Sequence, residues 1–139
     1  MRKFIISIDA GTTSNRSILF DLKGRPVFSS QKEFTQYFPK SGWVEHNPEE
    51  IWKTTLKTLK DAIHKSKRIR GEILSIGITN QRETTVLWDK KSGKPVYNAI
   101  VWQDRRQEEF CKKLRKQNKD TMIFNKTGLL IDSYFSGTK

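Results

Sequence analysis

The chain has 139 residues, with 27 Lys and Arg against 15 Asp and Glu, so its formal net charge is +12. This length favours a single domain, and a hydrophobic content of 35% can supply a core. No apolar run is long enough to span a membrane, and Asp9 comes too early for the apolar segment of a signal peptide. The single cysteine, Cys111, excludes an intramolecular disulfide and a cysteine-based metal cage. We therefore expect a cytoplasmic protein without a membrane span.

The first half of the chain is predicted to form three strands and a helix. Apolar runs at 4–8, 17–21 and 27–30 are separated by short turns, which favours an antiparallel meander. A helix is predicted over 48–66, because Asn47 can cap it and proline suits its first position. Four apolar residues recur at helical spacing and form the stripe expected to face the core, namely Trp52, Leu56, Leu59 and Ile63.

The second half is predicted to alternate strands and helices. The segment 73–79 is almost continuously apolar, which is typical of a buried strand. Two strands and two helices then follow at 84–88, 97–102, 104–117 and 119–126. The first of these helices is expected to bury Phe110 and Leu114. The order predicts an α/β fold with a mixed sheet that begins with an antiparallel meander.

A polar turn after the first strand has the composition of an anion site. It reads Asp9-Ala10-Gly11-Thr12-Thr13-Ser14-Asn15-Arg16. Backbone N–H groups and hydroxyls can bind phosphate oxygens, Arg16 adds positive charge, and Asp9 can hold a hydrated Mg²⁺. The Gly-Lys-Ser/Thr signature of a Walker loop is absent. An ordinary hairpin turn uses the same residue types, and composition alone favours that structural role.

Two further clusters could bind a small molecule. The polar stretch 79–85 contains Arg82, a donor of several hydrogen bonds, and Glu83, an acceptor, which together suit a small polyol. An ordinary turn with an exposed ion pair is the alternative. Trp102 ends an apolar run and could contact the C–H face of a substrate, although a tryptophan in that position more often belongs to the core.

The positive charge raises the alternative of a nucleic-acid-binding module. The basic residues that follow the first helix form a run at 65–70, but no aromatic residues interleave with them as a stacking platform requires. His46 and His64 fit no metal-binding pattern. We expect neither a specific nucleic-acid partner nor a zinc site.

Taken together, five stretches resemble the N-terminal part of the FGGY family of carbohydrate kinases, in its glycerol-phosphorylating branch. They are DAGTTSNR at 9–16, GWVEHNPEEIW at 42–52, ITNQRETTVLW at 78–88, GKPVYNAIVWQDRR at 93–106 and TGLLIDSYFSGTK at 127–139. The resemblance implies the actin-like ATPase (ribonuclease H-like) fold and transfer of phosphate from ATP to glycerol. A kinase for a pentulose or hexulose remains the alternative within the family.

The resemblance also implies roles for individual residues. The positions that match phosphate-contacting residues are Thr12, Thr13, Ser14 and Arg16, with Asp9 near Mg²⁺ through water and Thr12 also close to the phosphate that glycerol accepts. The positions that match glycerol-contacting residues are Arg82, Glu83, Trp102 and Tyr134. The Arg-Glu pair favours glycerol over longer sugars. Ala10 and Asn15 depart from the usual family residues without removing a proposed phosphate donor.

Members of the family continue well beyond the stretch that matches the end of this chain. The resemblance therefore implies that residues 1–139 are the N-terminal part of the first kinase domain, incomplete and without the second domain. No catalytic residue is expected within them, because the aspartate that acts as base would lie beyond Lys139. We expect no useful kinase activity from these residues alone, and a homo-oligomeric parent protein remains open.

Overall fold

The computed structural model describes all residues from 1 to 139 and divides them into two compact units. The first unit comprises residues 1–35 and 47–81, and the second comprises residues 36–46 and 82–139. Each unit is therefore assembled from segments that are distant in the sequence. None of the helices combines the length and the apolar character needed to cross a membrane.

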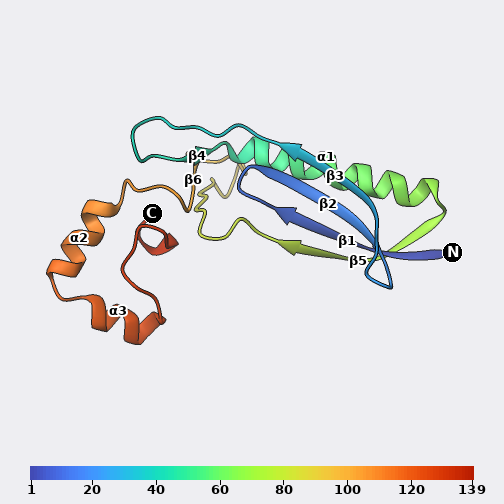
Figure 1. Cartoon of the computed structure of the whole chain (residues 1–139). Coiled ribbons are helices and arrows are strands. Elements are labelled where there is room, and N and C mark those ends of the chain that lie inside the picture. The colour runs from blue at the N-terminus through green and yellow to red at the C-terminus, as the bar shows by residue number, and fades with distance from the viewer. The chain divides into compact units, whose positions relative to one another are not determined.

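The first unit is a four-stranded mixed sheet with one long helix (Figure 1). Its strands are β1 (Arg2–Ala10), β2 (Ser14–Asp21), β3 (Pro26–Glu33) and β5 (Gly71–Thr79), in the spatial order β3-β2-β1-β5. β2 is antiparallel to both β1 and β3, whereas β5 is parallel to β1. The predicted three-strand meander is therefore confirmed, and the parallel β5 makes the sheet mixed.

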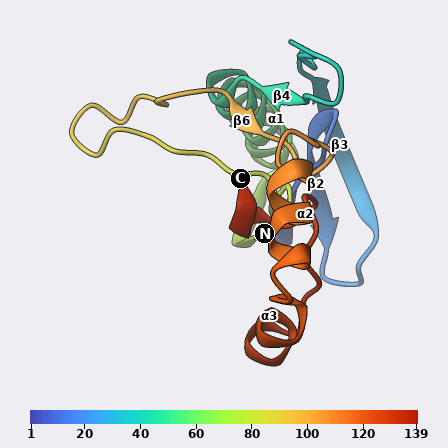
Figure 2. The ribbon, with the colours of Figure 1, turned by 90° about the vertical axis from the view of Figure 1, so that its left-hand side faces the viewer.

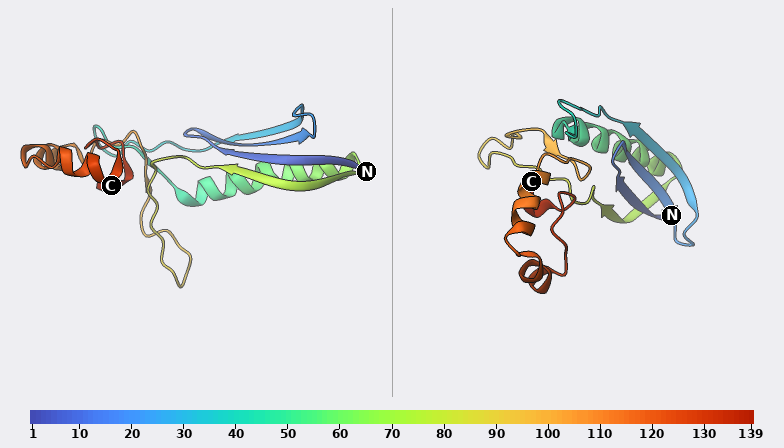
Figure 3. Two further views of the ribbon diagram at one scale, coloured as in Figure 1. Left: turned by 90° about the horizontal axis from the view of Figure 1, so that it is seen from below. Right: turned by 60° about the vertical axis from the view of Figure 1, so that its left-hand side comes forward.

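Helix α1 (Pro48–Arg68) begins the second segment of this unit and lies along one face of its sheet (Figure 3, left). The Asn47 side chain accepts a hydrogen bond from the Glu49 N–H at 2.9 Å, and a proline occupies the first turn. These are the N-terminal signals that predicted the helix, and they are confirmed. Acidic residues in its first turn and basic residues in its last turn complement the helix dipole.

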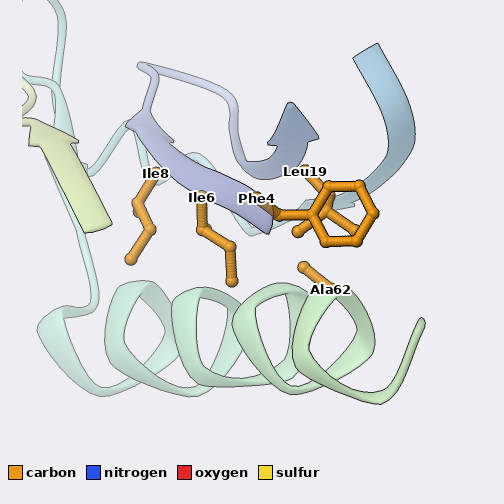
Figure 4. Close-up of a cluster of buried hydrophobic side chains, with 5 residues drawn as sticks. All are labelled: Phe4, Ile6, Ile8, Leu19 and Ala62. Carbon is orange, nitrogen blue, oxygen red and sulfur yellow. The ribbon is translucent and has the colours of Figure 1, made fainter. Parts of the chain in front are cut away.

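The core of the first unit lies between the sheet and α1. Alternating side chains of β1 point toward the helix, as the two-residue period of a strand requires. Figure 4 shows the buried cluster, which consists of Phe4, Ile6, Ile8, Leu19 and Ala62. Ile6 and Leu19 are paired across β1 and β2 and are both fully buried. Packing of this cluster attaches the helix to the first two strands.

The face that α1 presents to the sheet differs from the predicted apolar stripe. The buried helix residues are Thr58, Ala62 and Ser66, which are small and spaced four apart. Leu59 and Ile63 pack beside the core, but Trp52 is 59% exposed. Small residues let the helix approach the sheet closely, so the larger apolar side chains lie at the margins of the contact. Prediction of Trp52 as a core residue was therefore wrong.

β5 also differs from its prediction, because it is not buried. Ile76 and Ile78 pair with Ile6 and Ile8 of β1, but they are 45% and 73% exposed. β5 is an edge strand of this sheet. A continuous apolar run predicts a strand covered on both faces, and within this unit the end of β5 has no such cover.

The second unit contains little regular sheet. β4 (Glu45–His46) and β6 (Ala99–Ile100) form a two-residue antiparallel pair. The predicted strands at 84–88 and 97–102 are mostly absent, and only isolated bridges join Thr85 to Ile100 and Trp88 to Pro95. In Figure 2 the chain before β6 runs out and back as a long loop. Turn-forming residues at 89–95 and few sheet partners explain why the alternating pattern does not become extended strands.

Three short helices complete the second unit: α2 (Glu108–Lys116), α3 (Asp120–Thr127) and the 3-10 helix η1 (Ser136–Thr138). α2 begins four residues later than predicted, because Asp104 folds the preceding residues into a turn by binding the Arg106 N–H. Its buried residue is Cys111, whereas Phe110 is 52% exposed, contrary to the prediction. The predicted helix near 119–126 is confirmed as α3.

Candidate functional site

The predicted phosphate-binding turn is a β-hairpin between β1 and β2. The Gly11 N–H donates to the Ser14 carbonyl at 3.0 Å, and Asp9 and Arg16 are cross-strand partners. Cross-strand partners project to the same face, so this carboxylate and this guanidinium share the face opposite the core residues of β1. The structure thus confirms the hairpin alternative, and phosphate binding by the hydroxyl and charged groups of the same residues stays a prediction.

The hairpin contains one available donor and a tight glycine turn. The Nε atom of Arg16 is buried and has no hydrogen-bond partner, so a donor remains available there. A Cβ atom added at Gly11 would lie 2.9 Å from the Ser14 carbonyl oxygen, so a side chain would crowd this tight turn. Thr12 and Ser14 are partly exposed and Thr13 is exposed, so their hydroxyls lie at or near the surface.

The protein residues alone do not form a metal cage. No group of three or more His, Cys, Asp or Glu side chains is placed to hold an ion. Asp9 is the one carboxylate among residues 9–16, which form the turn end of this hairpin. A single carboxylate fits Mg²⁺, which keeps several waters and is commonly held by one or two carboxylates together with substrate phosphates. It does not fit Zn²⁺, which takes three or four side-chain ligands.

A buried ionic cluster in the second unit was not predicted from the sequence. Arg106 donates to Glu45 at 2.7 Å and to Asp104 at 2.9 Å; the two carboxylate side chains are nearly inaccessible, and that of Arg106 is 15% exposed. Its guanidinium carbon also lies 3.7 Å from the centroid of the Trp43 ring, which is a cation–π contact. The sequence signal was the Arg105-Arg106 doublet at the start of an expected helix, and only the second arginine lies between the two buried carboxylates.

Hydrogen bonds keep this cluster charged. Burial by itself would raise the pKa of Glu45, but bonds from Asn98, Arg106 and Tyr97 outweigh it and hold that pKa below its ordinary value. Burial opposes ionisation of Asp104 in the same way, and its bonds from Arg106 and the Val44 N–H again lower the pKa. The cluster joins β4, β6 and the turn before α2, and therefore fixes the backbone on both sides of Trp102.

The predicted polyol-contacting positions lie in this second unit. The rings of Trp102 and Tyr134 meet edge to face with centroids 5.6 Å apart. Glu83 accepts two hydrogen bonds from Ser136, each 2.8 Å long. Arg82 is exposed in the turn before Glu83. The structure therefore brings Trp102 to Tyr134, and Glu83 to the residues just after Tyr134.

Residues from the α2 region hold the segment that carries Tyr134. Arg105 donates to Asp132 and Ser133 at 3.0 Å each, and Arg115 donates to the Ile131 carbonyl at 2.7 Å. Asp132 in turn accepts from the Tyr134 N–H at 2.7 Å. Sequence reasoning noted Arg105 only as part of a charged doublet and predicted none of these supporting contacts, because they join segments about 16 to 28 residues apart.

Comparison with known proteins places the chain in a family. The N-terminal domain of the FGGY family of carbohydrate kinases matches residues 4–139. The chain belongs to this family. Among solved structures, glycerol kinase of Plasmodium falciparum with ADP superimposes with a TM-score of 0.91 at 36% identity, covering 99% of this chain and 28% of that one. The α/β actin-like ATPase fold expected from the resemblance is thereby confirmed.

Relatives of known activity extend far beyond the matched region. Glycerol kinases of Rhizobium meliloti and Sinorhizobium fredii are 58% and 59% identical to this chain over all 139 residues. This FGGY chain spans only 28% of the length of either relative. Gluconate kinase of Lactobacillus acidophilus has a TM-score of 0.86 at 24% identity, and this likeness shows the shared fold alone.

Proposed function

We propose that residues 1–139 serve as the N-terminal part of the first domain of a kinase that transfers the γ-phosphoryl group of ATP to glycerol, forming sn-glycerol 3-phosphate. One observation carries this proposal. Identity to glycerol kinases reaches 56–59% over the whole chain, against 24% to gluconate and xylulose kinases that share the fold. A kinase that consumes ATP would act in the cytoplasm.

Positioning and charge stabilisation would supply most of the catalysis, as is usual for phosphoryl transfer. Thr12, Thr13 and Ser14 would donate to phosphate oxygens, and the unpartnered Nε of Arg16 supports a phosphate contact there. Asp9 would hold Mg²⁺ through water, and the ion would neutralise charge on the phosphates. The base that accepts the hydroxyl proton would lie outside these residues.

The second unit would bind the polyol. Arg82 can donate to hydroxyl oxygens and Glu83 can accept from hydroxyl groups, so each substrate oxygen meets a complementary partner. The Trp102 and Tyr134 rings, which already contact each other, would supply an apolar wall for the C–H groups. A short polyol satisfies such a set without leaving buried polar groups unpaired.

A substrate panel tests the proposed activity. The full-length protein, assayed with ATP and Mg²⁺, should phosphorylate glycerol with a kcat/KM at least about 100-fold above that for D-xylulose or gluconate, since unpaired polar groups cost about 1–3 kcal/mol each. The isolated 139 residues should show no useful turnover. Equal use of D-xylulose, or substantial turnover by residues 1–139, would contradict the proposal.

A single substitution tests the polyol assignment. Arg82→Ala removes charge-assisted hydrogen bonds worth about 1.5–3 kcal/mol, so kcat/KM for glycerol should fall about 10- to 100-fold while the KM for ATP stays unchanged. Arg25→Ala is the matched control, because Arg25 is 70% exposed and pairs with Asp21 at the β2–β3 turn. An unchanged glycerol KM in the Arg82 variant would refute the assigned role.

A further inference from the structure

Ser136 makes a two-point contact with the Glu83 carboxylate. Its backbone N–H and its hydroxyl both donate to the same oxygen, Oε2, at 2.8 Å each, although the two residues are 53 positions apart. Ser136 is the first residue of η1, where the backbone N–H is free to point outward from the turn. Because both bonds go to Oε2, Ser136 leaves the second carboxylate oxygen, Oε1, unoccupied by its donors.

Glu83 combines an unusual backbone conformation with a side chain that Ser136 holds. Its φ is +57°, in the left-handed region that a residue with a side chain rarely adopts. The two bonds from Ser136 are the main reason that the pKa of Glu83 lies below its ordinary value, and the charges of Lys139 and Arg82 act in the same direction. The carboxylate is therefore held ionised and in one orientation.

Ser136 itself lies on a fixed segment. Asp132 binds both the Arg105 side chain and the Tyr134 N–H, and the Lys139 ammonium donates to the Ser133 and Tyr134 carbonyls at 2.9 and 2.6 Å. Tyr134 packs edge to face against Trp102. One short segment thus supplies an aromatic wall and, two residues later, the donors that orient Glu83.

We propose that Ser136 is a positioning residue for polyol recognition, which fixes Glu83 through Oε2 and leaves Oε1 to accept a hydrogen bond from a substrate hydroxyl. Ser136 acts through Glu83 and does not itself contact the polyol. The inference rests on the proposed function insofar as Glu83 binds the polyol. It adds a specificity-determining residue whose effect reaches the substrate indirectly.

Kinetics of the full-length protein test this role. Ser136→Ala removes the hydroxyl donor and should raise the KM for glycerol about tenfold, with a smaller change in kcat and an unchanged KM for ATP. Ser136→Thr keeps a hydroxyl and should restore most of the glycerol affinity. Ser29→Ala is the matched control, because Ser29 is exposed on β3 and its side chain makes no hydrogen bond.

Two further measurements separate this inference from the proposed function. NMR titration of the Glu83 carboxyl should show a higher pKa in Ser136→Ala than in the wild type. In a Glu83→Gln background, Ser136→Ala should add little to the glycerol KM, since the two residues act as a unit. A wild-type glycerol KM in Glu83→Gln would overturn the polyol role of Glu83. A raised KM in Glu83→Gln with wild-type KM and pKa in Ser136→Ala would overturn the positioning role alone.

Discussion

Removal of the Arg106 side chain should unfold part of the second unit at lower denaturant concentration. Arg106→Ala leaves two carboxylates without their cation, and these side chains are only 2% and 0% exposed in Glu45 and Asp104. Breaking a buried ion pair by removing one partner costs about 3–5 kcal/mol. The loss of the cation–π contact with Trp43 adds to this, although the 15% exposure of Arg106 moderates the total.

The neighbouring arginine provides a matched control. Arg105 pairs with Asp132 and donates to the Ser133 hydroxyl, at 3.0 Å each, but the Arg105 and Asp132 side chains are 54% and 44% exposed. An exposed pair contributes about 0–1 kcal/mol because water and salt screen it. Arg105→Ala should therefore cost at least about 2 kcal/mol less than Arg106→Ala, although the two substitutions remove the same side chain at adjacent positions.

Urea denaturation followed by circular dichroism measures the difference in unfolding free energy. Hydrogen exchange of peptides covering 97–106 shows whether the loss of stability lies in this segment. Exchange there should accelerate about 100-fold for a loss of about 3 kcal/mol. Adding Glu45→Gln and Asp104→Asn to Arg106→Ala should recover part of the stability, because these changes remove the unpaired charges. A cost for Arg106→Ala within about 1 kcal/mol of that for Arg105→Ala would refute this account of the cluster.

Two other predictions concern stability. The pKa values of Glu45 and Asp104 are lowered in the folded state, so their contribution to stability is complete above about pH 4.5 and is lost as the pH falls through the folded values. The urea concentration at the unfolding midpoint should therefore decrease as the pH is lowered below about 4.5, and this decrease should be smaller in Glu45→Gln. Gly71→Ala places a Cβ 2.2 Å from the Phe4 ring and should lower the free energy of unfolding by about 1–3 kcal/mol. Gly77→Ala is the control, because its Cβ meets nothing within 4 Å, and it should leave the unfolding free energy in the same urea titration unchanged or raise it.

Local sequence signals predicted much of the first unit. Alternating apolar residues specified β1 and β2, short turns specified their antiparallel connection, and Asn47 with Pro48 marked the start of α1. These features depend on residues that are close in the sequence, so they can be predicted from a single sequence. The hairpin at 9–16 was placed for the same reason, and its role in phosphate binding stays a prediction.

Contacts between distant segments were not predictable in this way. β5 has the apolar run of a buried strand, yet its edge position leaves Ile78 largely exposed, because burial depends on which layers cover a strand. The strands expected at 84–88 and 97–102 lack sheet partners of sufficient length. Strand formation needs a partner, whereas a helix closes its own hydrogen bonds, so helices were the better predicted elements.

The sequence by itself determined the family, the N-terminal meander, the long helix and the excess of positive charge. Only the tertiary structure decided where individual charges lie. The Arg105-Arg106 doublet looks uniform in the sequence, but one guanidinium is exposed beside Asp132 and the other is buried between two carboxylates. Likewise, the bond from Ser136 to Glu83 joins residues 53 positions apart. Charge is a property of the residue, but its free energy depends on the solvent and partners that the fold provides.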